Sequence, residues 1–316
     1  MSRTVSPPYA ERMLRRLEWS VLRRLDGVLM GDYGSLLRGA GVDLTDLREY
    51  QLHDDVRHLD WNVTARMQTP FVRVFTEDRE MAAWFLLDLS ASVSFGSGVR
   101  RKRDVLAEFV AALARLLTRH GNRVGALLYG GGVEQIIAPR ASRQHVLSLL
   151  HAIVRRADQP EAKPRTTRLA DLLHAAANVV QRRCTLFVVS DFFSEPGWDK
   201  PLAQLATRHD AVAVRLLDPL EREMPDLGVL TLCDAESGEQ LLADTRDPGF
   251  RRRFAAAALR REAELSAALA RAGVDTLELS TDDDLTDAII RFADLRKRRA
   301  RLAAGGGVPA HLRKMA

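Results

Sequence analysis

The chain has 316 residues, 46% of them hydrophobic and 28% charged, which is the composition of an ordinary globular protein with one large domain or one domain with additions. Its formal net charge is +5, and most of the excess positive charge comes from arginine. This charge is consistent with binding to an acidic partner or to nucleic acid, and equally with the composition of an arginine-rich proteome. The basic residues are not interleaved with aromatic ones, so a base-stacking nucleic-acid surface is not expected.

Cysteine usage and hydropathy indicate the compartment. The two cysteines, Cys184 and Cys233, lie far apart without CxxC or histidine spacing, which argues against a disulfide framework and a zinc site. No apolar stretch approaches the roughly 20 residues that span a bilayer. The first residues, MSRTVSPPYAERMLRRLEW, lack the apolar core of a secretory signal. We therefore expect a cytoplasmic protein without a membrane span.

The first part of the chain predicts little regular structure. Residues 8–28 form an amphipathic helix by pattern, with an apolar stripe between arginines. A glycine-punctuated loop follows at 31–41, and the charge-dense stretch 42–62 indicates turns and short helices. Residues 69–76 alternate apolar and charged side chains, as a half-exposed strand does.

From residue 81 onward, strands alternate with helices. Fully buried strands are predicted at 81–87 and 185–190, and further strands at 211–217 and 274–279. The helices expected between and after them cover 101–120, 142–154, 169–180, 200–207, 248–272 and 283–301. Two hairpins complete the series, one joining 123–129 to 133–138 and one over 227–245. This alternation predicts an α/β fold, a doubly wound and mostly parallel sheet with one antiparallel edge strand.

Oxygen-bearing side chains follow the two buried strands at their carboxyl ends. Asp88 ends the first strand and is followed by Ser90 and Ser92, and Asp191 ends the second. In doubly wound sheets, ligands bind at this edge where the strand order reverses. Hydroxyls with one or two carboxylates suit a hard cation such as Mg²⁺. The alternative interpretation is a strand end with a serine that caps the next helix.

A loop before the helix at 169 offers a third hydroxyl. Thr166 and Thr167 both precede that helix, and either one is a candidate ligand. The pattern leaves the choice between them open.

These motifs resemble a known site. Asp88-x-Ser90-x-Ser92, the step Thr167-Arg168-Leu169 and the stretch VVSDF with Asp191 resemble the metal-ion-dependent adhesion site of von Willebrand factor A domains. The preceding segment resembles the bacterial family called domain of unknown function 58, which carries the pattern R-x-Y, D-D-x-R-x-x-D-W and A-R. The positions that match this pattern are Arg48, Tyr50, Asp54, Asp55, Arg57, Asp60, Trp61, Ala65 and Arg66.

The resemblance implies a von Willebrand A-like domain that binds a partner. Ser90, Ser92 and Thr167 would bind Mg²⁺, or Mn²⁺ or Ca²⁺, directly, with Asp88 and Asp191 acting through water. A Glu or Asp of a protein partner would complete the metal shell. Proteins of this family resemble those encoded beside MoxR-type AAA+ ATPases, which implies an adaptor or co-chaperone in the assembly of other proteins.

The family resemblance also implies a division of the chain. We expect an N-terminal family segment at 1–78 packed on the main domain, a von Willebrand A-like domain at 79–301 and a flexible tail at 302–316. Within the first segment, the clustered acids and His53 and His58 allow an acid–base or second metal centre. The preferred interpretation is structural, with Arg48, Arg57 and Arg66 pairing with these acids and Trp61 anchoring the segment.

Two alternative functions remain beside the non-enzymatic interaction module. One is a metal-dependent hydrolase that uses Asp88 and Asp191, although such sites usually hold several direct carboxylates or histidines. The other is a nucleic-acid-binding protein that uses the basic residues. No GxxxxGK[ST] motif is present, so a phosphate-binding loop of that kind is excluded.

Overall fold

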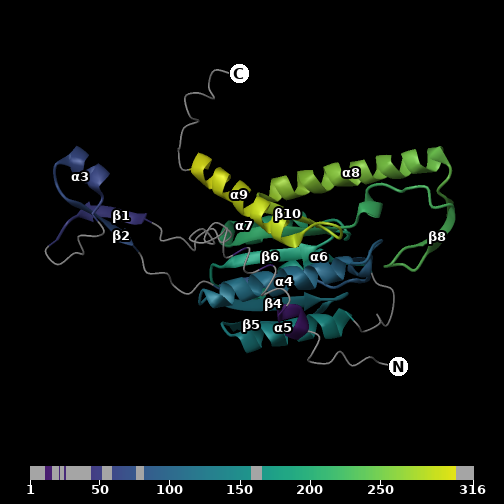
Figure 1. Ribbon diagram of the computed structural model, residues 1–316, viewed down its shortest axis with the longest axis horizontal. Coiled ribbons are helices and arrows are strands. Elements are labelled where there is room, and N and C mark those ends of the chain that lie inside the picture. Colours follow the sequence, from purple (N-terminus) through teal and green to yellow (C-terminus); the bar gives the residue numbers. More distant parts are fainter. Residues whose placement is uncertain are drawn as a thin grey trace, which may run out of the picture.

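A computed structural model describes residues 11–15, 21, 25, 44–51, 59–75, 82–157 and 166–303. Its centre is a six-stranded sheet in the order β10-β7-β6-β3-β4-β5 (Figure 1). These strands are β3 (Ala82–Asp88), β4 (Arg123–Tyr129), β5 (Val133–Arg140), β6 (Thr185–Ser190), β7 (Asp210–Leu217) and β10 (Asp275–Ser280). All pairs are parallel except β4 with β5, so the predicted mostly parallel sheet with one antiparallel edge strand is confirmed.

The strand order contains a single reversal. The chain passes from β3 outward to β4 and β5, then returns to the other side of β3 with β6 and continues outward to β7 and β10. β3 and β6 pair in parallel from Ala83 with Thr185 to Leu87 with Val189. The switch point of this doubly wound sheet, where such folds bind ligands, therefore lies between β3 and β6.

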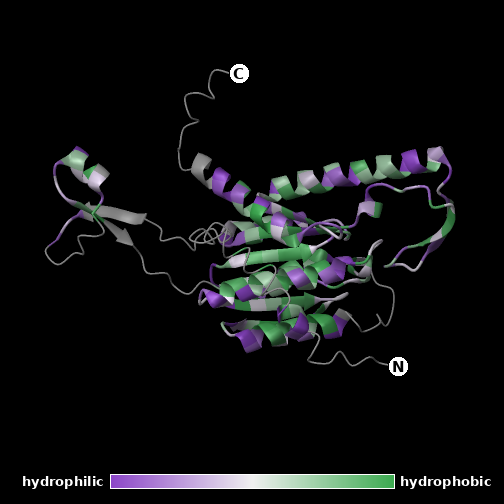
Figure 2. Ribbon diagram, viewed as in Figure 1, coloured by the Kyte–Doolittle hydropathy of each residue, from purple (hydrophilic) through white to green (hydrophobic). Residues whose placement is uncertain are grey.

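Helices cover both faces because the inner strands are apolar on both sides. Along β3, Phe85 and Leu87 pack into the core of one face, and Trp84 and Leu86 into the core of the other. Figure 2 shows mainly hydrophobic inner strands and helices on which hydrophobic and hydrophilic residues alternate. On the first face lie α4 (Lys102–Arg119), α5 (Arg143–Ala157) and α9 (Leu285–Ala303), and on the second lie α6 (Leu169–Val179), α7 (Asp199–Arg208) and α8 (Pro248–Ala272). The six helices predicted after residue 81 are confirmed, with boundaries within a few residues.

Helix α8 is long and only partly packed. It has 25 residues, but its buried side chains, Leu265, Ala268, Leu269 and Ala272, all lie in its second half. Its first turn is capped by Asp247, whose carboxylate accepts hydrogen bonds from the N–H groups of Gly249 and Phe250. Figure 1 shows the first half of α8 extending beyond the sheet.

The predicted second hairpin is present as an arm between β7 and α8. It consists of β8 (Val229–Cys233) and β9 (Gln240–Asp244), which pair with each other in a separate two-stranded sheet. In Figure 1 the arm descends at the right from the start of α8. Its ends are held together by Thr245, whose hydroxyl donates to the carbonyl of Gly228 at 2.7 Å.

The N-terminal segment departs from expectation in part. The strand expected at 69–76 is β2 (Phe71–Phe75), but it pairs with a strand, β1 (Leu44–Glu49), in a stretch expected to hold only turns and short helices. Helix α3 (Trp61–Met67) connects them and is capped by Asp60, which accepts from the Val63 N–H at 3.2 Å. Trp61 is 70% exposed, and the expectation that its ring anchors the segment to the main domain stays a prediction.

Several expectations for this segment fall outside the described residues. They concern Asp54, Asp55 and Arg57. The helix predicted at 8–28 is described only at residues 11–15, 21 and 25. Of these residues, Leu14 and Leu25 are buried in the core on the first face of the sheet. The packing of residues 1–78 on the main domain and the tail from 304 stay predictions. None of the described helices is long and apolar enough to cross a membrane.

Candidate functional site

The switch point brings two carboxylates to the same edge of the sheet. Asp88 is the last residue of β3, and Asp191 follows the last residue of the neighbouring β6. Both are buried. Burial, and after it the negative charge of Asp191, raise the pKa of Asp88 to about 7.

Asp88 is held in place by two hydrogen bonds, one to each oxygen. The Ser90 N–H donates to Oδ1 at 3.0 Å, and the Ser190 hydroxyl donates to Oδ2 at 2.6 Å. The Ser90 hydroxyl is a further hydrogen-bond partner of this carboxylate. Together these contacts orient the Asp88 side chain toward the loop that carries Ser90.

The two serines present their hydroxyls to each other. Ser90 occupies the cap position of the short 3₁₀ helix η4 (Ala91–Ser94), but its side chain makes no capping hydrogen bond there. Instead its Oγ lies 3.2 Å from the Oγ of Ser92. The capping alternative therefore lacks the hydrogen bond on which it depends, and two hydroxyl oxygens lie close together beside Asp88.

The structure distinguishes the two candidate threonines by burial. Thr167 is 1% exposed, whereas Thr166 is exposed. The Thr167 carbonyl accepts from the Glu195 N–H at 2.9 Å and from the Ser194 hydroxyl at 3.0 Å. These contacts connect the threonine loop to the loop that follows β6, so Thr167 is fixed to the same edge of the sheet as Asp191.

Tyr129 fixes the same loop from the other side. Its ring is buried at the carboxyl end of β4, where it pairs with Asp88 in the sheet register. The Arg168 N–H donates to its hydroxyl oxygen at 2.9 Å. Nothing in the sequence pattern singles out this tyrosine.

Thr167 binds an acidic side chain that the sequence pattern does not single out. Its hydroxyl donates to Oε1 of Glu236 at 2.6 Å, and its N–H donates to Oε2 at 2.8 Å. Glu236 lies in the turn of the β8–β9 arm, about 70 residues further along the chain. The hairpin predicted over 227–245 was the one signal in the sequence that indicated a turn near this residue.

Asp191 also has a partner that the sequence pattern did not reveal. The ammonium of Lys102, at the start of α4, lies 2.6 Å from Asp191 Oδ2 and 2.6 Å from Oε1 of Glu221. Lys102 is 1% exposed. Burial lowers the pKa of this ammonium, but the charges of Asp191 and Glu221 outweigh burial and raise it. A positive charge is thus already bound beside the metal-ligand candidates.

The backbone after β6 is strained. Phe192 has a φ of 60°, a left-handed conformation that is unusual for a bulky residue. This turn allows its N–H to donate to Ser190 Oγ at 2.9 Å and the Phe193 N–H to donate to Asp191 Oδ1 at 3.1 Å. Its ring packs on Trp198, with the centroids 5.2 Å apart. The packing and hydrogen bonds hold Asp191 in a single orientation.

A third buried carboxylate, Asp218 at the end of β7, organises the loop after the serines. It accepts from the Ser97 N–H at 2.9 Å, the Ser97 hydroxyl at 2.6 Å, the Thr281 hydroxyl at 2.7 Å and the Leu220 N–H at 3.0 Å. Burial alone would raise the pKa of Asp218, but these hydrogen bonds, Ser97 first, lower it below its usual value. Asp218 is fully bonded, so its role is to position the loop.

The ligand chemistry of this edge is that of a hard cation. It offers hydroxyls from Ser90, Ser92 and Thr167 with carboxylates from Asp88 and Asp191, all of them oxygen ligands. Among the described residues, no group of three or more His, Cys, Asp or Glu side chains is arranged to hold a metal. A metal here would therefore depend on the hydroxyls, unlike the carboxylate- or histidine-rich centres of metal-dependent hydrolases.

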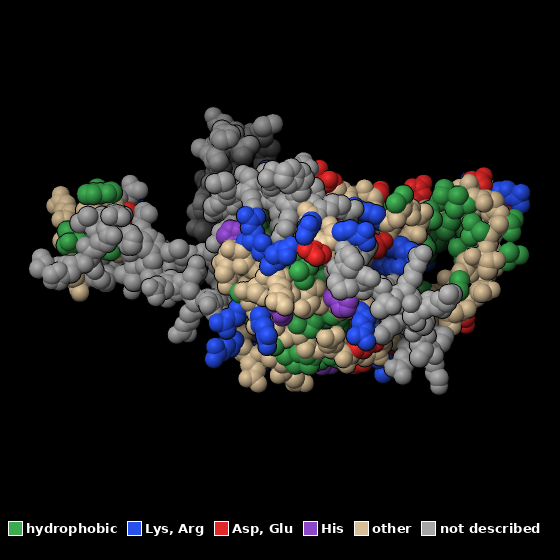
Figure 3. Space-filling view, turned by 60° about the horizontal axis from the view of Figure 1, so that its bottom comes forward, with side chains coloured by type: hydrophobic (Ala, Val, Ile, Leu, Met, Phe, Trp, Pro, Cys, Tyr) green, Lys and Arg blue, Asp and Glu red, His purple; other side chains and the backbone are tan. Residues whose placement is uncertain are grey.

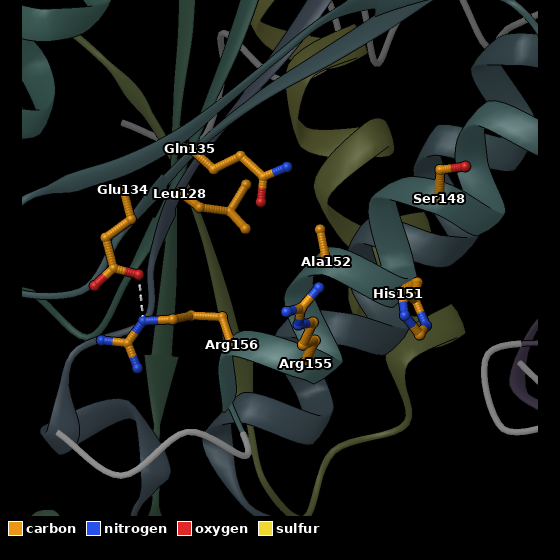
Figure 4. Close-up of a pocket in the computed structure, with 8 residues that line it drawn as sticks. All are labelled: Leu128, Glu134, Gln135, Ser148, His151, Ala152, Arg155 and Arg156. Atoms are coloured by element: carbon orange, nitrogen blue, oxygen red, sulfur yellow. Dashed lines mark hydrogen bonds and ion pairs between the residues drawn. The ribbon is translucent and has the colours of Figure 1, made fainter. Parts of the chain in front are cut away.

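A separate pocket of about 340 Å³ lies between the β4–β5 hairpin and α5 (Figure 4). Leu128 and Gln135 line it from the strands, and His151 and Arg155 from the helix. An ion pair between Arg156 and Glu134 crosses its rim. None of the five predicted metal-site residues lines this pocket.

Comparison with known proteins identifies relatives over nearly the whole chain. The family described as "Protein of unknown function DUF58" matches residues 46–264, more than half of the chain. Uncharacterised proteins of Mycobacterium tuberculosis and Mycobacterium bovis are each 38% identical over 298 residues, covering 94% of this chain and 92% of the relative.

Two solved structures are similar at low sequence identity. An aerotolerance-related membrane protein of Bacteroides fragilis matches with 11% identity and a TM-score of 0.45, covering 69% of this chain and 99% of that one. The conserved hypothetical protein BatB of Bacteroides thetaiotaomicron matches with 12% identity and a TM-score of 0.44 over the same shares.

Proposed function

The chain belongs to the DUF58 family of proteins of unknown function, and we propose that it is a non-enzymatic protein-interaction module that uses a divalent metal ion to bind a carboxylate of its partner. The observation that carries the proposal is the convergence of Asp88 and Asp191 at the switch point, beside hydroxyls that bond to each other. The von Willebrand A-like site named in the sequence analysis has this composition.

Each of the five residues has a distinct role in the proposal. Ser90, Ser92 and Thr167 bind Mg²⁺, or Mn²⁺ or Ca²⁺, through their oxygens. Asp88 and Asp191 act through water, which agrees with the hydrogen bonds that already occupy part of each carboxylate. Because few charged ligands touch the ion, it stays electrophilic and binds a Glu or Asp side chain from outside.

Lys102 sets a condition on this proposal. Its ammonium neutralises Asp191 and Glu221 from one side, so it does not by itself neutralise Asp88. A divalent ion would lie between Asp88 and the hydroxyls and would share Asp191 with Lys102. The positive charge of Lys102 then offsets part of the negative charge of the site and weakens its attraction for a metal ion.

The expected partner follows from family resemblance alone. We propose a MoxR-type AAA+ ATPase, with this chain acting as an adaptor or co-chaperone in the assembly or maturation of other proteins. A single metal–carboxylate bond in a partly dry interface would be the centre of such a contact.

The proposal is tested first by metal binding. Mn²⁺ is titrated into the purified full chain, and free ion is measured by electron paramagnetic resonance. Ser90→Ala with Ser92→Ala removes two ligands and should weaken binding at least tenfold, or about 1.4 kcal/mol. Ser94→Ala is the matched control, because this serine is exposed in the same 3₁₀ helix.

Partner binding is tested second. The wild-type chain, immobilised with Mg²⁺ or with a chelator, is exposed to a purified MoxR-type ATPase. Binding should need Mg²⁺ and should be lost in the double serine variant while its fold is retained. Binding that survives both chelation and the double substitution would contradict the proposal.

A further inference from the structure

The β8–β9 arm ends in a turn that aims one side chain at the candidate site. Asp234 accepts hydrogen bonds from the Glu236 N–H at 3.2 Å and from the Ser237 hydroxyl at 2.6 Å. The Gly238 N–H donates to the Asp234 carbonyl at 2.9 Å, and Gly238 has a φ of 74°, as such a tight turn requires. These hydrogen bonds fix the backbone of the turn, and the backbone in turn fixes the direction of the Glu236 side chain.

Glu236 connects the turn of the β8–β9 arm to the main domain. Of residues 233–240, it is the only one that is not exposed. Both of its carboxylate oxygens are bound to Thr167, one to the hydroxyl and one to the N–H. A carboxylate that accepts two hydrogen bonds in this way forms a specific two-point contact.

The flanks of the arm are exposed and apolar. Leu241 and Leu242 in β9 are 60% and 72% exposed, and Val229 in β8 is 52% exposed. Figure 3 shows hydrophobic side chains at the right end of the molecule, where the arm lies. Within the described part of the chain, hydrogen bonds hold the arm at its base, through Thr245, and at its turn, where Thr167 donates two hydrogen bonds to Glu236.

The position of Glu236 has a chemical meaning for the proposed metal site. A partner's Glu or Asp would have to approach the ion next to Thr167, which is the residue that Glu236 already covers. We infer that the β8–β9 arm is an internal competitor, whose Glu236 carboxylate occupies the position of the partner's acid and closes the site until it is displaced. This inference rests on the proposed function, since it assigns a regulator to that same site.

Physical considerations indicate that such a closure is reversible. The contact consists of two hydrogen bonds, and each contributes only modestly to stability because water can replace either partner when the contact opens. Tethering gives Glu236 an effective concentration on the order of millimolar or higher. A partner that offers a carboxylate together with an apolar contact surface would therefore compete successfully, whereas a small carboxylate would do so only at high concentration.

The test uses a nitroxide attached to Cys233, which is exposed in β8. Cys184 is buried, and burial raises the pKa of its thiol to about 12, so it stays unlabelled at neutral pH. In the wild-type chain the label should be immobilised. Glu236→Ala and Thr167→Val should each increase its mobility several-fold, and the double variant should show no further increase. Glu239→Ala, an exposed acid of the same turn, is the control and should have no effect.

The second arm of the test measures competition. With Mn²⁺ present, sodium acetate at roughly 0.1–1 M should mobilise the label in the wild-type chain, and sodium chloride at equal ionic strength should not. Ser90→Ala with Ser92→Ala should abolish the acetate effect.

The two proposals can fail separately. A label that is mobile in the wild-type chain, or unchanged by Glu236→Ala, overturns the inference even if Mn²⁺ binds. If Mn²⁺ binds but acetate does not mobilise the label, the inference is also overturned, because Glu236 then only stabilises the arm and does not compete for the metal site. If Mn²⁺ binds to none of these chains, the proposed function fails, and with it the role of Glu236 as a competitor, whatever the label shows.

Discussion

Lys102 and Asp191 form a buried ion pair, with Nζ and Oδ2 2.6 Å apart, at the edge of the sheet where the metal-ligand candidates meet. The pair connects the first turn of α4 to the loop after β6, and Glu221 completes it from the loop after β7. Because the ammonium lies between two carboxylates, its removal leaves two negative charges buried and without a counter-ion.

Replacing Lys102 by Met should destabilise the protein by about 3–5 kcal/mol, because the remaining carboxylates lose their counter-charge. The loss should be partly restored by millimolar Mg²⁺, which can supply positive charge to Asp191. Thermal unfolding with and without Mg²⁺ measures both effects, and Lys200→Met, at an exposed position of α7, is the control. A Lys102→Met chain that is as stable as the wild type would show that the pair contributes nothing.

The two threonines should differ in their effect on metal affinity. Thr167→Val removes the buried hydroxyl and should weaken Mn²⁺ binding roughly tenfold or more, equivalent to about 1.4 kcal/mol. Thr166→Val changes an exposed side chain and should leave the dissociation constant within about twofold. Equal or reversed effects in the same Mn²⁺ titration would transfer the ligand role to Thr166.

Stability without divalent metal should fall as pH rises. The pKa of Asp88 is about 7 in the folded chain against 3.8 for an exposed aspartate, so the folded state binds this proton more tightly than the unfolded state does. Stability therefore decreases between pH 3.8 and about 7, by up to a few kcal/mol.

Denaturant unfolding at pH 5 and pH 8 measures this dependence. Asp88→Asn should flatten it, and Mg²⁺ should reduce it by favouring the ionised carboxylate. A wild-type chain that becomes more stable across this range would contradict the raised pKa.

Asp218→Asn should destabilise the protein by about 2–4 kcal/mol, since an amide NH₂ cannot accept the hydrogen bonds now made by Ser97 and Thr281. The loop that carries Ser97 should then exchange its amide hydrogens faster. Hydrogen exchange followed by mass spectrometry measures this, with Glu223→Gln as an exposed control. Unchanged exchange in residues 95–101 would show that Asp218 does not hold the loop.

The sheet was predictable because its signals are local. Residues 185–190, TLFVVS, have four consecutive apolar residues at their centre, and this short run, rich in β-branched and aromatic residues, is typical of a strand buried on both faces. The meeting of Asp88 and Asp191 followed from the general geometry of parallel strands. The fold class and the edge of the sheet that carries the site were therefore accessible from sequence.

The partners of the site were not predictable in the same way. Glu236 reaches Thr167 across 69 residues, and Lys102 reaches Asp191 across 89. Neither contact leaves a trace in periodicity or spacing, because both depend on how separate loops pack in three dimensions. β1 was missed for a related reason, since its charged sequence LTDLRE lacks the apolar alternation of a typical strand.

The half of α8 that extends past the sheet has a thermodynamic consequence of its own. The fully buried side chains of α8 are confined to residues 265–272, and just before them Glu262 pairs with Arg215 of β7 and Arg261 lies over the ring of Phe193. The helicity of residues 248–260 therefore depends largely on the cap at Asp247 and on intrinsic propensity. The run FAAAALR at 254–260 is rich in alanine, leucine and arginine, which are strong helix formers. A few glycines placed in this run would therefore unwind the base from which the arm extends, while the core of the domain would keep its free energy of unfolding.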